Sequence, residues 1–278
     1  MLPGKGIAAI STVLLLLAAA AAAALQPGEA YRDIMQRKEL RVAVSIDYPP
    51  LNFNAGEKGV EVEMARGLGA FLGAEVRLVP LPVGRFTAAL EQREVDVVIA
   101  GYSRSLARAK TVWFSEPYLT VTPAVLADSR SIPQTSYGAQ FEQPPIRTVW
   151  DLKRLTDFRF AVKKGSAYED LLAAEFPDMT RVVVSSNEEG MDLLKKGAVN
   201  GFVHDSLFLE YLYGTSAKLR SSYVLLAGGP RIEKICVGLP FGDTVLKQQV
   251  DTYIQEVLRL GRIEEWLARY SVKRAVQP

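Results

Sequence analysis

Short apolar runs alternate with amphipathic segments along most of this 278-residue chain, and the alternating order occurs twice. In each half, β-branched runs of strand length precede segments whose apolar residues recur at helical spacing. This order is typical of α/β units, in which parallel strands are joined by right-handed helical crossovers. The sequence therefore predicts an α/β protein made of two similar halves.

The predicted elements follow the same order in both halves. In the first half, strands at 40–46, 75–79 and 95–100 alternate with helices at 62–72 and 85–92. In the second half, strands at 158–162, 181–184 and 201–204 alternate with helices at 168–176 and 188–196. An irregular, proline-containing excursion at 129–147 separates the halves, and helices at 243–260 and 263–270 close the chain.

Charge and residue usage exclude several classes of function. The chain has 33 Lys and Arg residues against 31 Asp and Glu residues, and a net charge of +2 gives no electrostatic signal for nucleic acid. With one histidine, His204, and one cysteine, Cys236, a zinc site is disfavoured and an internal disulfide is excluded. Neither a phosphate-binding loop nor a dinucleotide fingerprint occurs. We therefore expect no metal and no cofactor, and we expect Cys236 to be a small buried residue.

Residues 1–25 have the layout of a secretory signal peptide. Lys5 gives a positive start, an apolar run covers 7–25, and the small residues from Ala22 to Ala24 suit a cleavage site. We expect cleavage near Ala24, which would leave a soluble, exported protein. The alternative is an uncleaved anchor, because an apolar stretch of about 19 residues is just long enough to span a bilayer.

Polar side chains follow the predicted strands at the ends where ligands bind in open parallel sheets. Tyr48, Ser103 and Arg108 do so in the first half, and Ser166 and Asp205 do so in the second. A guanidinium group binds a carboxylate through paired hydrogen bonds, hydroxyls fill the remaining lone pairs, and a carboxylate binds an ammonium group. Together these groups indicate a site for a zwitterion. Taken singly, Arg108 is also typical of a solvated surface, and Asp205 is typical of a helix N-cap.

Five stretches of the chain carry a resemblance to a known family. They are residues 40–53, 59–73, 95–118, 160–172 and 199–212. The third, VDVVIAGYSRSLARAKTVWFSEPY, has a serine–hydroxyl–arginine pattern followed by an aromatic-Ser-acid-Pro-Tyr segment. In this order and spacing, the chain from 40 to 270 resembles the periplasmic amino-acid-binding proteins of the family-3 extracellular solute-binding class, the receptors of ABC importers.

The resemblance implies a type II periplasmic-binding-protein fold, which is a two-lobed clamshell with two hinge strands and a ligand cleft between the lobes. Lobe 1 would combine residues 26–122 and 223–278, and lobe 2 would comprise residues 123–222. The protein would bind a polar or acidic amino acid in the periplasm and deliver it to the membrane permease of an ABC importer. We expect a monomer that works by closing around its ligand.

Carried over position by position, the family's binding residues in lobe 1 fall at strand ends. Tyr48 would pack over the ligand, and Gly101 would offer backbone groups. Ser103 would offer a hydroxyl, and Arg108 would bind the α-carboxylate. The resemblance therefore assigns the carboxylate clamp mainly to the first half of the chain.

In lobe 2, Ser166 and the neighbouring amides would complete carboxylate binding, and Asp205 would accept the α-amino group. The chain departs from the family's pattern at four places: Val60, residues 82–84, Arg104 and Ala167. These departures affect the pocket for the ligand's side chain more than the clamp on its backbone. Arg85, Arg104 and His204 would favour an acidic side chain if they face the cleft, but each could instead point to solvent.

An enzyme is the alternative. Relatives of this fold include cyclohexadienyl dehydratases, which act on prephenate or arogenate with an added acid in the cleft. Here no acid follows Asp205 until Glu210, about one turn beyond the expected place. A hydrolytic triad is disfavoured because His204 and Asp205 are adjacent, and neighbouring side chains on a strand point to opposite faces. We therefore predict a binding protein without catalytic activity.

Overall fold

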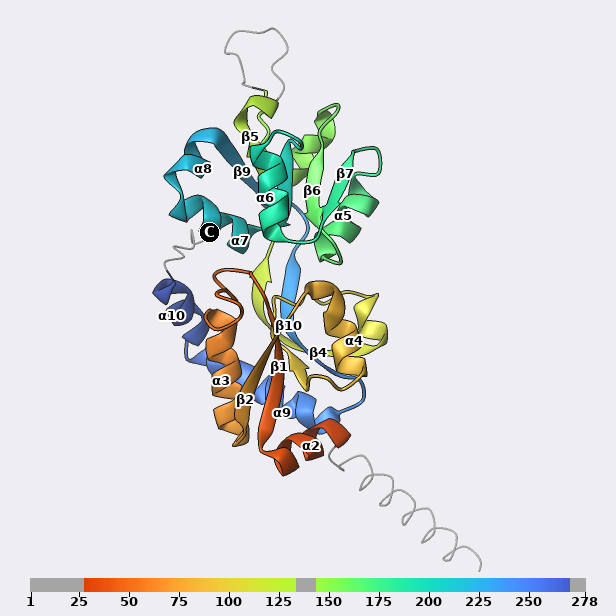
Figure 1. Cartoon of the computed structure of the whole chain (residues 1–278), viewed down its shortest axis with the longest axis vertical. Coiled ribbons are helices and arrows are strands. Elements are labelled where there is room, and N and C mark those ends of the chain that lie inside the picture. The colour runs from red at the N-terminus through yellow and green to blue at the C-terminus, as the bar shows by residue number, and fades with distance from the viewer. Residues whose placement is uncertain (1–27, 134–143, 271–278) are drawn as a thin grey trace, which may run out of the picture.

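The computed structural model of the chain describes residues 28–133 and 144–270, which form two five-stranded sheets with helices packed around each (Figure 1). The α/β class predicted from the sequence is confirmed. The expected signal peptide at 1–25 lies outside the described residues, as does the central part, 134–143, of the irregular excursion. Within the described ranges, no helix is long and apolar enough to cross a membrane.

The first sheet has the strand order β2-β1-β3-β10-β4. Its strands are β1 (Glu39–Ser45), β2 (Glu75–Leu81), β3 (Val97–Val98), β4 (Val112–Val121) and β10 (Glu233–Pro240). Strand β1 pairs in parallel with β2 and β3, whereas β10 pairs antiparallel with β3 and β4. The helices of this half are α2 (Glu29–Arg37), α3 (Val60–Leu72), α4 (Phe86–Glu91), α9 (Thr244–Arg259) and α10 (Arg262–Arg269).

The second sheet has the order β7-β6-β8-β5-β9 and the same mixture of directions. Its strands are β5 (Pro123–Asp128), β6 (Phe160–Lys163), β7 (Arg181–Val184), β8 (Gly201–Asp205) and β9 (Tyr223–Ala227). Strand β6 is parallel to β7 and β8, and β5 is antiparallel to β8 and β9. The helices are α5 (Ala167–Glu175), α6 (Asn187–Lys195), α7 (Ser206–Thr215) and α8 (Ala217–Ser222).

The chain passes between the two sheets twice. Strand β4 leads through Thr122 into β5, and β9 leads through residues 228–232 into β10. Because β9 belongs to the second sheet, the return passage begins after Ala227, a few residues later than the boundary we placed at 223 from the sequence. We propose that the two lobes divide at these passages.

The predicted strands and helices occur close to their expected positions, with informative differences. Gly73 ends α3 in the left-handed conformation, with φ of 66°, as its place in the sequence predicts. The strand predicted at 95–100 is reduced to the two residues of β3. Both sheets are mixed rather than purely parallel, because β10 and β5 enter them antiparallel.

Helices on both sides of the first sheet bury its central strands. The last four residues of β1, from Val42 to Ser45, are all buried, which is typical of a strand covered on both faces. Cys236 in β10 is completely buried, as expected, and burial raises the pKa of its thiol to about 11. This thiol therefore stays protonated and packs as a small apolar group.

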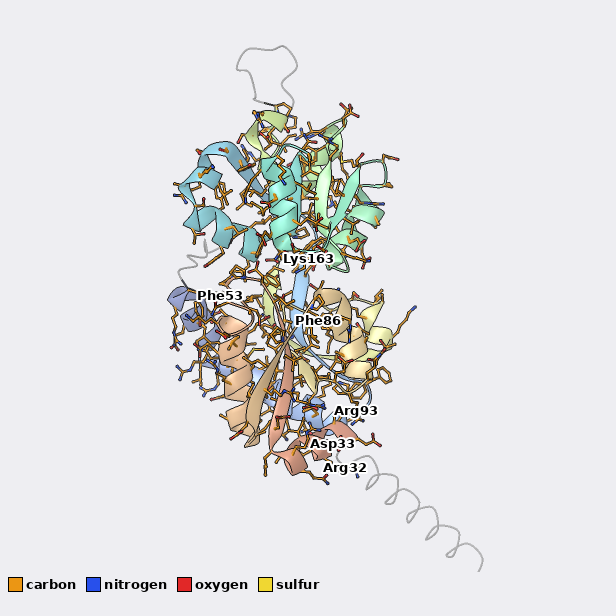
Figure 2. The ribbon with its side chains drawn as sticks, in the orientation of Figure 1. Arg32, Asp33, Phe53, Phe86, Arg93 and Lys163 are labelled. Atoms are coloured by element: carbon orange, nitrogen blue, oxygen red, sulfur yellow. The ribbon has the colours of Figure 1, made fainter. Side chains whose placement is uncertain are left out.

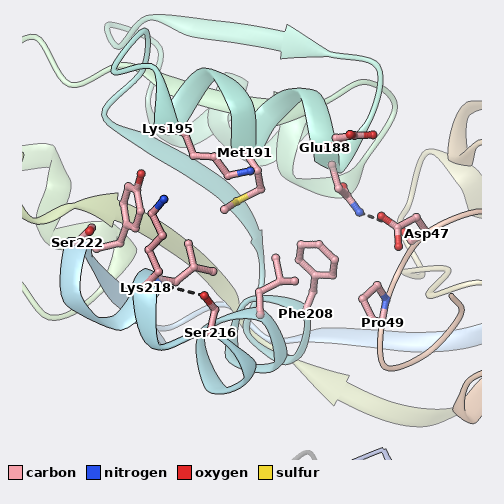
Figure 3. Close-up of a pocket in the computed structure, with 13 residues that line it drawn as sticks. Asp47, Pro49, Glu188, Met191, Lys195, Phe208, Ser216, Lys218 and Ser222 are labelled. Atoms are coloured by element: carbon pink, nitrogen blue, oxygen red, sulfur yellow. Dashed lines mark hydrogen bonds between the residues drawn. The ribbon is translucent and has the colours of Figure 1, made fainter. Parts of the chain in front are cut away.

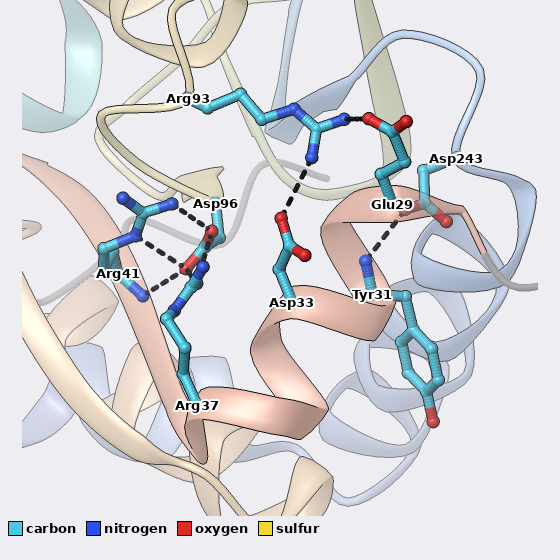
Figure 4. A network of polar contacts seen from close by, with 8 residues as sticks. All are labelled: Glu29, Tyr31, Asp33, Arg37, Arg41, Arg93, Asp96 and Asp243. Atoms are coloured by element: carbon cyan, nitrogen blue, oxygen red, sulfur yellow. Dashed lines mark hydrogen bonds and ion pairs between the residues drawn. The ribbon is translucent and has the colours of Figure 1, made fainter.

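A group of charged side chains joins α2 to the start of β3 (Figure 4). Asp96, which is 3% exposed, accepts hydrogen bonds from the guanidinium groups of Arg37 and Arg41 and from the backbone N–H of Arg41. A neighbouring ion pair, Arg93 with Glu29 at 2.7 Å, is exposed. The buried Asp96 carboxylate thus has several hydrogen-bond partners, whereas the exposed pair of Arg93 and Glu29 remains solvated.

We expect Asp96→Asn to lower the free energy of unfolding by about 1.5–3 kcal/mol, because a neutral amide cannot satisfy two guanidinium groups and a backbone N–H. Glu29→Gln is the matched control at the exposed pair and should lower it by less than about 1 kcal/mol. Urea denaturation of both variants measures the difference. Equal losses in the two variants would show that the buried ion pairs of Asp96 stabilise the fold no more than the exposed pair does.

Candidate ligand-binding site

A small cavity of about 40 Å³ lies between the two sheets, at the carboxyl ends of β1, β3, β6 and β8. Ligands bind at this edge of open α/β sheets, and here two such edges face each other. Both halves of the chain contribute to the cavity wall, which consists of Ser45, Tyr48, Val83, Ala100, Gly101, Ser103, Arg108, Lys163, Ser166, Ala167, Tyr168 and His204. One small ligand could therefore contact both lobes at once.

Most residues singled out from the sequence meet at this cavity. Those that line it are Tyr48, Gly101, Ser103, Arg108, Ser166 and His204. Arg85 and Arg104 do not line it. Arg85 forms an exposed ion pair with Glu94 at 3.0 Å, and Arg104 is exposed. Ser103 bridges to β10 in extended backbone, so the next side chain, Arg104, points away from the cavity that Ser103 faces.

Contacts to backbone and to an aromatic ring fix Arg108 at the boundary between the sheets. Its Nη1 donates to the Ser103 carbonyl at 2.8 Å, and its Nη2 donates to the Gly165 carbonyl of the second half at 3.0 Å. The guanidinium also lies over the Tyr102 ring, 4.7 Å from the centroid. A guanidinium has five N–H donors, so three remain for a ligand carboxylate.

The second half presents a helix N-terminus and an amine to the same cavity. Ser166 is the N-cap of α5, and its side chain accepts a hydrogen bond from the Glu169 N–H. The first turn of such a helix favours an anion. Lys163 ends β6 at the junction of the two halves (Figure 2) and lines the cavity without an ion pair among the described residues. Burial lowers its pKa. The sequence did not single out Lys163, because a lysine at a strand end is usually solvated.

Asp205 is completely buried just behind the cavity wall. Its Oδ1 accepts from the Phe208 N–H at 2.8 Å, so the N-cap interpretation left open by the sequence is confirmed. Its Oδ2 contacts the Tyr48 hydroxyl and His204 Nδ1. Burial raises the pKa of this carboxyl, but the His204 charge and the hydrogen bonds together hold it below its usual value. The ionised carboxylate of Asp205 therefore has hydrogen-bond partners from the protein on both oxygens, without a ligand.

The contact between His204 and Asp205 corrects our expectation that these adjacent side chains point to opposite faces. His204 Nδ1 lies 2.6 Å from Asp205 Oδ2. Asp205 is both the last residue of β8 and the N-cap of α7, so its side chain turns back toward the helix and leaves the strand alternation. The imidazole stacks on Phe208, with the ring centroids 4.1 Å apart, and lines the cavity.

Glu61 in α3 is a second fully buried carboxylate, which our sequence analysis missed. It accepts hydrogen bonds from the Gly101 N–H at 2.7 Å, the Tyr118 hydroxyl and the Asn52 amide. Burial is the largest effect and raises its pKa to about 7, although these hydrogen bonds oppose the rise. An acid in the first turn of an amphipathic helix is usually solvated, and no local signal distinguished Glu61 from Glu63.

Gly101 brings the backbone of the first half against the Tyr48 ring. Its φ of 62° is left-handed, and a Cβ at this position would clash with that ring. Because Glu61 accepts its N–H, the carbonyl of Gly101 rather than its amide remains for a ligand.

Glu233, the first residue of β10, is the third buried carboxylate at the site and, like Glu61, was missed from the sequence. The Ser103 hydroxyl donates to its Oε2 at 2.8 Å, and its Oε1 has no hydrogen-bond partner among the described residues. Burial raises its pKa, although the Ser103 hydrogen bond opposes the rise. Tyr168, which lines the cavity, interacts with Glu233 through its hydroxyl, and this hydrogen bond and the Glu233 charge contribute, after burial, to raising the pKa of Tyr168. No group of three or more His, Cys, Asp and Glu side chains in the described ranges could hold a metal ion.

Two mixed sheets joined by two passages, with polar groups of both meeting at the cleft, define a two-lobed α/β solute-binding protein. The chain belongs to the bacterial extracellular solute-binding proteins, family 3, whose model matches residues 40–273. This confirms the resemblance inferred from the sequence. The fold is similar to that of an amino-acid ABC transporter substrate-binding protein of Streptococcus pneumoniae bound to L-arginine, with a TM-score of 0.73 and 20% identity over 87% of this chain and 100% of that one.

Some of the curated relatives are enzymes. The chain is 30% identical over 243 residues to membrane-bound lytic murein transglycosylase F of Idiomarina loihiensis, which is 84% of this chain and 50% of the relative. It is 31% identical over 132 residues to cyclohexadienyl dehydratase of Pseudomonas aeruginosa, which is 45% of this chain and 48% of the relative. The matches thus span about half the length of each relative.

The raised pKa of Glu61 predicts a pH-dependent stability. In the folded protein Glu61 holds its proton up to a pH of about 7, whereas the unfolded chain releases it near 4.5. The folded state therefore binds more protons in this window. The resulting stabilisation is complete below pH 4.5 and is lost as the pH rises through 7, on the order of 3 kcal/mol in total.

We expect Glu61→Gln to flatten the fall in the free energy of unfolding between pH 5 and 8, as measured by urea denaturation. Glu57→Gln replaces an exposed acid nearby and should keep the wild-type profile. A wild-type profile that is flat over this range would contradict the assignment of the raised pKa to Glu61.

Proposed function

We propose that this protein is an exported receptor that binds a polar or acidic amino acid between its lobes and delivers it to the permease of an ABC importer. Residues 1–25 would be removed near Ala24, and the mature protein would act in the periplasm as a monomer. The observation that carries the proposal is the convergence of Arg108, Lys163 and the N-terminus of α5 on one cavity. Membership of the solute-binding family supports the receptor role, and the L-arginine bound by the similar S. pneumoniae protein supports an amino acid as the ligand.

The ligand's α-carboxylate would lie between Arg108 and the first turn of α5. The hydrogen bond from Arg108 to the Gly165 carbonyl brings the guanidinium beside Ser166, the cap of that helix. A carboxylate there would accept from the guanidinium and from first-turn amides at the same time. The hydrogen bond to the Ser103 carbonyl, within the first half, already restricts the guanidinium, so binding would cost little side-chain conformational entropy.

Lys163, rather than Arg85 or Arg104, is the cation that would recognise an acidic side chain. It faces the cavity, and burial lowers its pKa, so a ligand carboxylate would stabilise its charged form. Arg85 and Arg104 are exposed outside the cavity. His204 would contact the ligand's polar groups from the opposite lobe to Ser103.

The ligand's amino group needs a carboxylate acceptor, and Glu233 has an oxygen available. Oε1 of Glu233 is buried without a partner among the described residues, beside the cavity residue Ser103. Both oxygens of Asp205 are already engaged. We therefore assign the amino group to Glu233 and give Asp205 the role of a cap and an anchor for Tyr48.

Ligand entry requires the contacts between the lobes to open. Arg108 bonds to the Gly165 carbonyl, Tyr48 contacts Asp205, and the Asn187 amide donates to the Asp47 carbonyl at 2.8 Å. Hinge motion at the two passages between the sheets would separate these pairs, and closure around a ligand would restore them. The closed form would then be the state that a permease recognises.

A second candidate function is a dehydratase acting on prephenate or arogenate. The observation that favours it is His204, held by Asp205 at 2.6 Å and facing the cavity, which is the arrangement of a general base with an orienting acid. The 31% identity to cyclohexadienyl dehydratase supports it. In this candidate the cleft would convert its ligand instead of passing it on.

Thermal unfolding against the twenty amino acids and prephenate tests both candidates. The mature protein is first freed of carried-over ligand by unfolding and refolding. A ligand at about a hundred times its dissociation constant adds about 2.7 kcal/mol, which raises the midpoint by several degrees. Shifts with one or a few amino acids, without turnover, are expected. A shift with prephenate alone, followed by its conversion, would replace the receptor by the dehydratase.

Arg108→Ala should weaken binding of the identified amino acid by at least a hundredfold, or about 2.7 kcal/mol, because the ligand carboxylate loses its charged partner. Arg104→Ala, on the same segment but outside the cavity, is the matched control and should stay within threefold. Isothermal titration calorimetry measures both. A loss below threefold in Arg108→Ala would remove this residue from the carboxylate site.

Glu233→Gln should weaken the amino acid at least tenfold while sparing its analogue without the amino group, because only the ammonium contact is lost. Asp205→Asn should mainly lower the unfolding midpoint, since this residue caps α7. Titration of both ligands into both variants separates the roles. If Asp205→Asn alone discriminates between the two ligands, the amino group belongs to Asp205.

A further inference from the structure

A groove of about 420 Å³ lies on the far side of Phe208 from the cleft (Figure 3). Phe208 lines the groove and also stacks on His204, which lines the cleft cavity, so one ring separates the two spaces. The groove floor is apolar and includes Met191, Leu212 and Leu219. Its volume falls within the range of small-molecule sites, which is roughly 300–1,000 Å³.

Charged groups of opposite sign stand at the two ends of the groove. Lys195 from α6 and Lys218 from α8 approach one end from facing walls (Figure 3). The ammonium group of Lys218 has no ion pair among the described residues, and that of Lys195 has only an exposed contact with Asp192 at 3.2 Å. Such an exposed pair is weak and readily exchanged for a ligand anion. This end therefore suits a carboxylate.

The other end offers acceptors. Asp47 and Glu188 line it with exposed carboxylates (Figure 3). Asn187, which is 4% exposed, donates its amide N–H to the Asp47 carbonyl, but its Oδ1 has no hydrogen-bond partner among the described residues. A buried acceptor left unpaired costs about 1–3 kcal/mol. A donor on a ligand, above all an ammonium group, would satisfy Asn187 and lie beside two carboxylates.

The distance between the two ends follows from α6. Asn187 is its first residue and Lys195 its last, so eight steps of helical rise separate them by about 12 Å. An extended chain of three residues spans about 10 Å between its termini. A molecule of this length would place one charge at each end and lay its apolar middle over the floor of the groove.

We propose that this groove is a second binding site, separate from the cleft, for an elongated zwitterion with an apolar middle and charges about 10–12 Å apart. The termini of a short apolar peptide and the ends of an ω-amino carboxylate share this chemistry. Asp47 and Pro49 of the first half form part of the wall, and the rest comes from the second half. An occupant would therefore contact both lobes.

Calorimetric titration of the mature protein with the tripeptide Leu-Ala-Leu and with 8-aminooctanoate tests the proposal. The tighter binder shows whether the groove prefers a short peptide or an ω-amino carboxylate. Octanoate and octylamine, which each lack one charge, should bind at least fivefold more weakly than 8-aminooctanoate. The double variant Lys195→Gln/Lys218→Gln should bind either zwitterion at least tenfold more weakly. Lys196→Gln, the adjacent exposed lysine outside the groove, should stay within twofold.

The same titration in Arg108→Ala separates the groove from the cleft. Binding that persists in this variant supports a second site, and binding that disappears places both zwitterions in the cleft and overturns the proposal. Absence of saturable binding to the wild type overturns it as well, as does an equal loss in Lys196→Gln and the double variant. A failure of amino-acid binding in the cleft leaves these outcomes unaffected.

Discussion

The contact between the Tyr48 hydroxyl and the Asp205 carboxylate joins the two halves of the molecule at a fully buried point. Among the described residues two short passages link the sheets, so side chains at the seam also determine how the halves meet. A buried carboxylate is stable only where donors replace water. Tyr48 supplies one donor from the first half, the Phe208 N–H supplies another from the second, and His204 Nδ1 contacts the same carboxylate. Pairing of the lobes thus also satisfies a buried charge.

Three buried carboxylates around one small cavity make its electrostatics strongly dependent on cations. The Asp205 charge contributes to raising the pKa of both Glu61 and Glu233, although burial is the larger effect in each. The Arg108 charge opposes the rise at Glu233, and Lys163 lines the same cavity from the other lobe. A zwitterion carries both signs and therefore adds little net charge to a region of low dielectric, where an unbalanced ion would be costly.

The positions of Arg108 and Ser166 could be predicted because strand ends in α/β sheets follow from local patterns. The antiparallel strands β4 and β9 were not predicted, since their pairing depends on partners distant in the chain. Glu61 and Glu233 were missed for the same reason: an acid in a helix or at a strand start is usually exposed, and only tertiary packing buries it. The outward direction of Arg104 likewise depends on a bridge to β10.

The bare backbone of Gly101 makes room for the Tyr48 ring, and that ring reaches Asp205 across the seam. A methyl group there would occupy the ring's place, and the left-handed conformation would strain any other residue. Such a substitution would displace the Tyr48 ring, which belongs to the buried apolar core, and would break its contact with Asp205 across the seam. The side chain that joins the two halves therefore depends on the absence of a side chain at position 101.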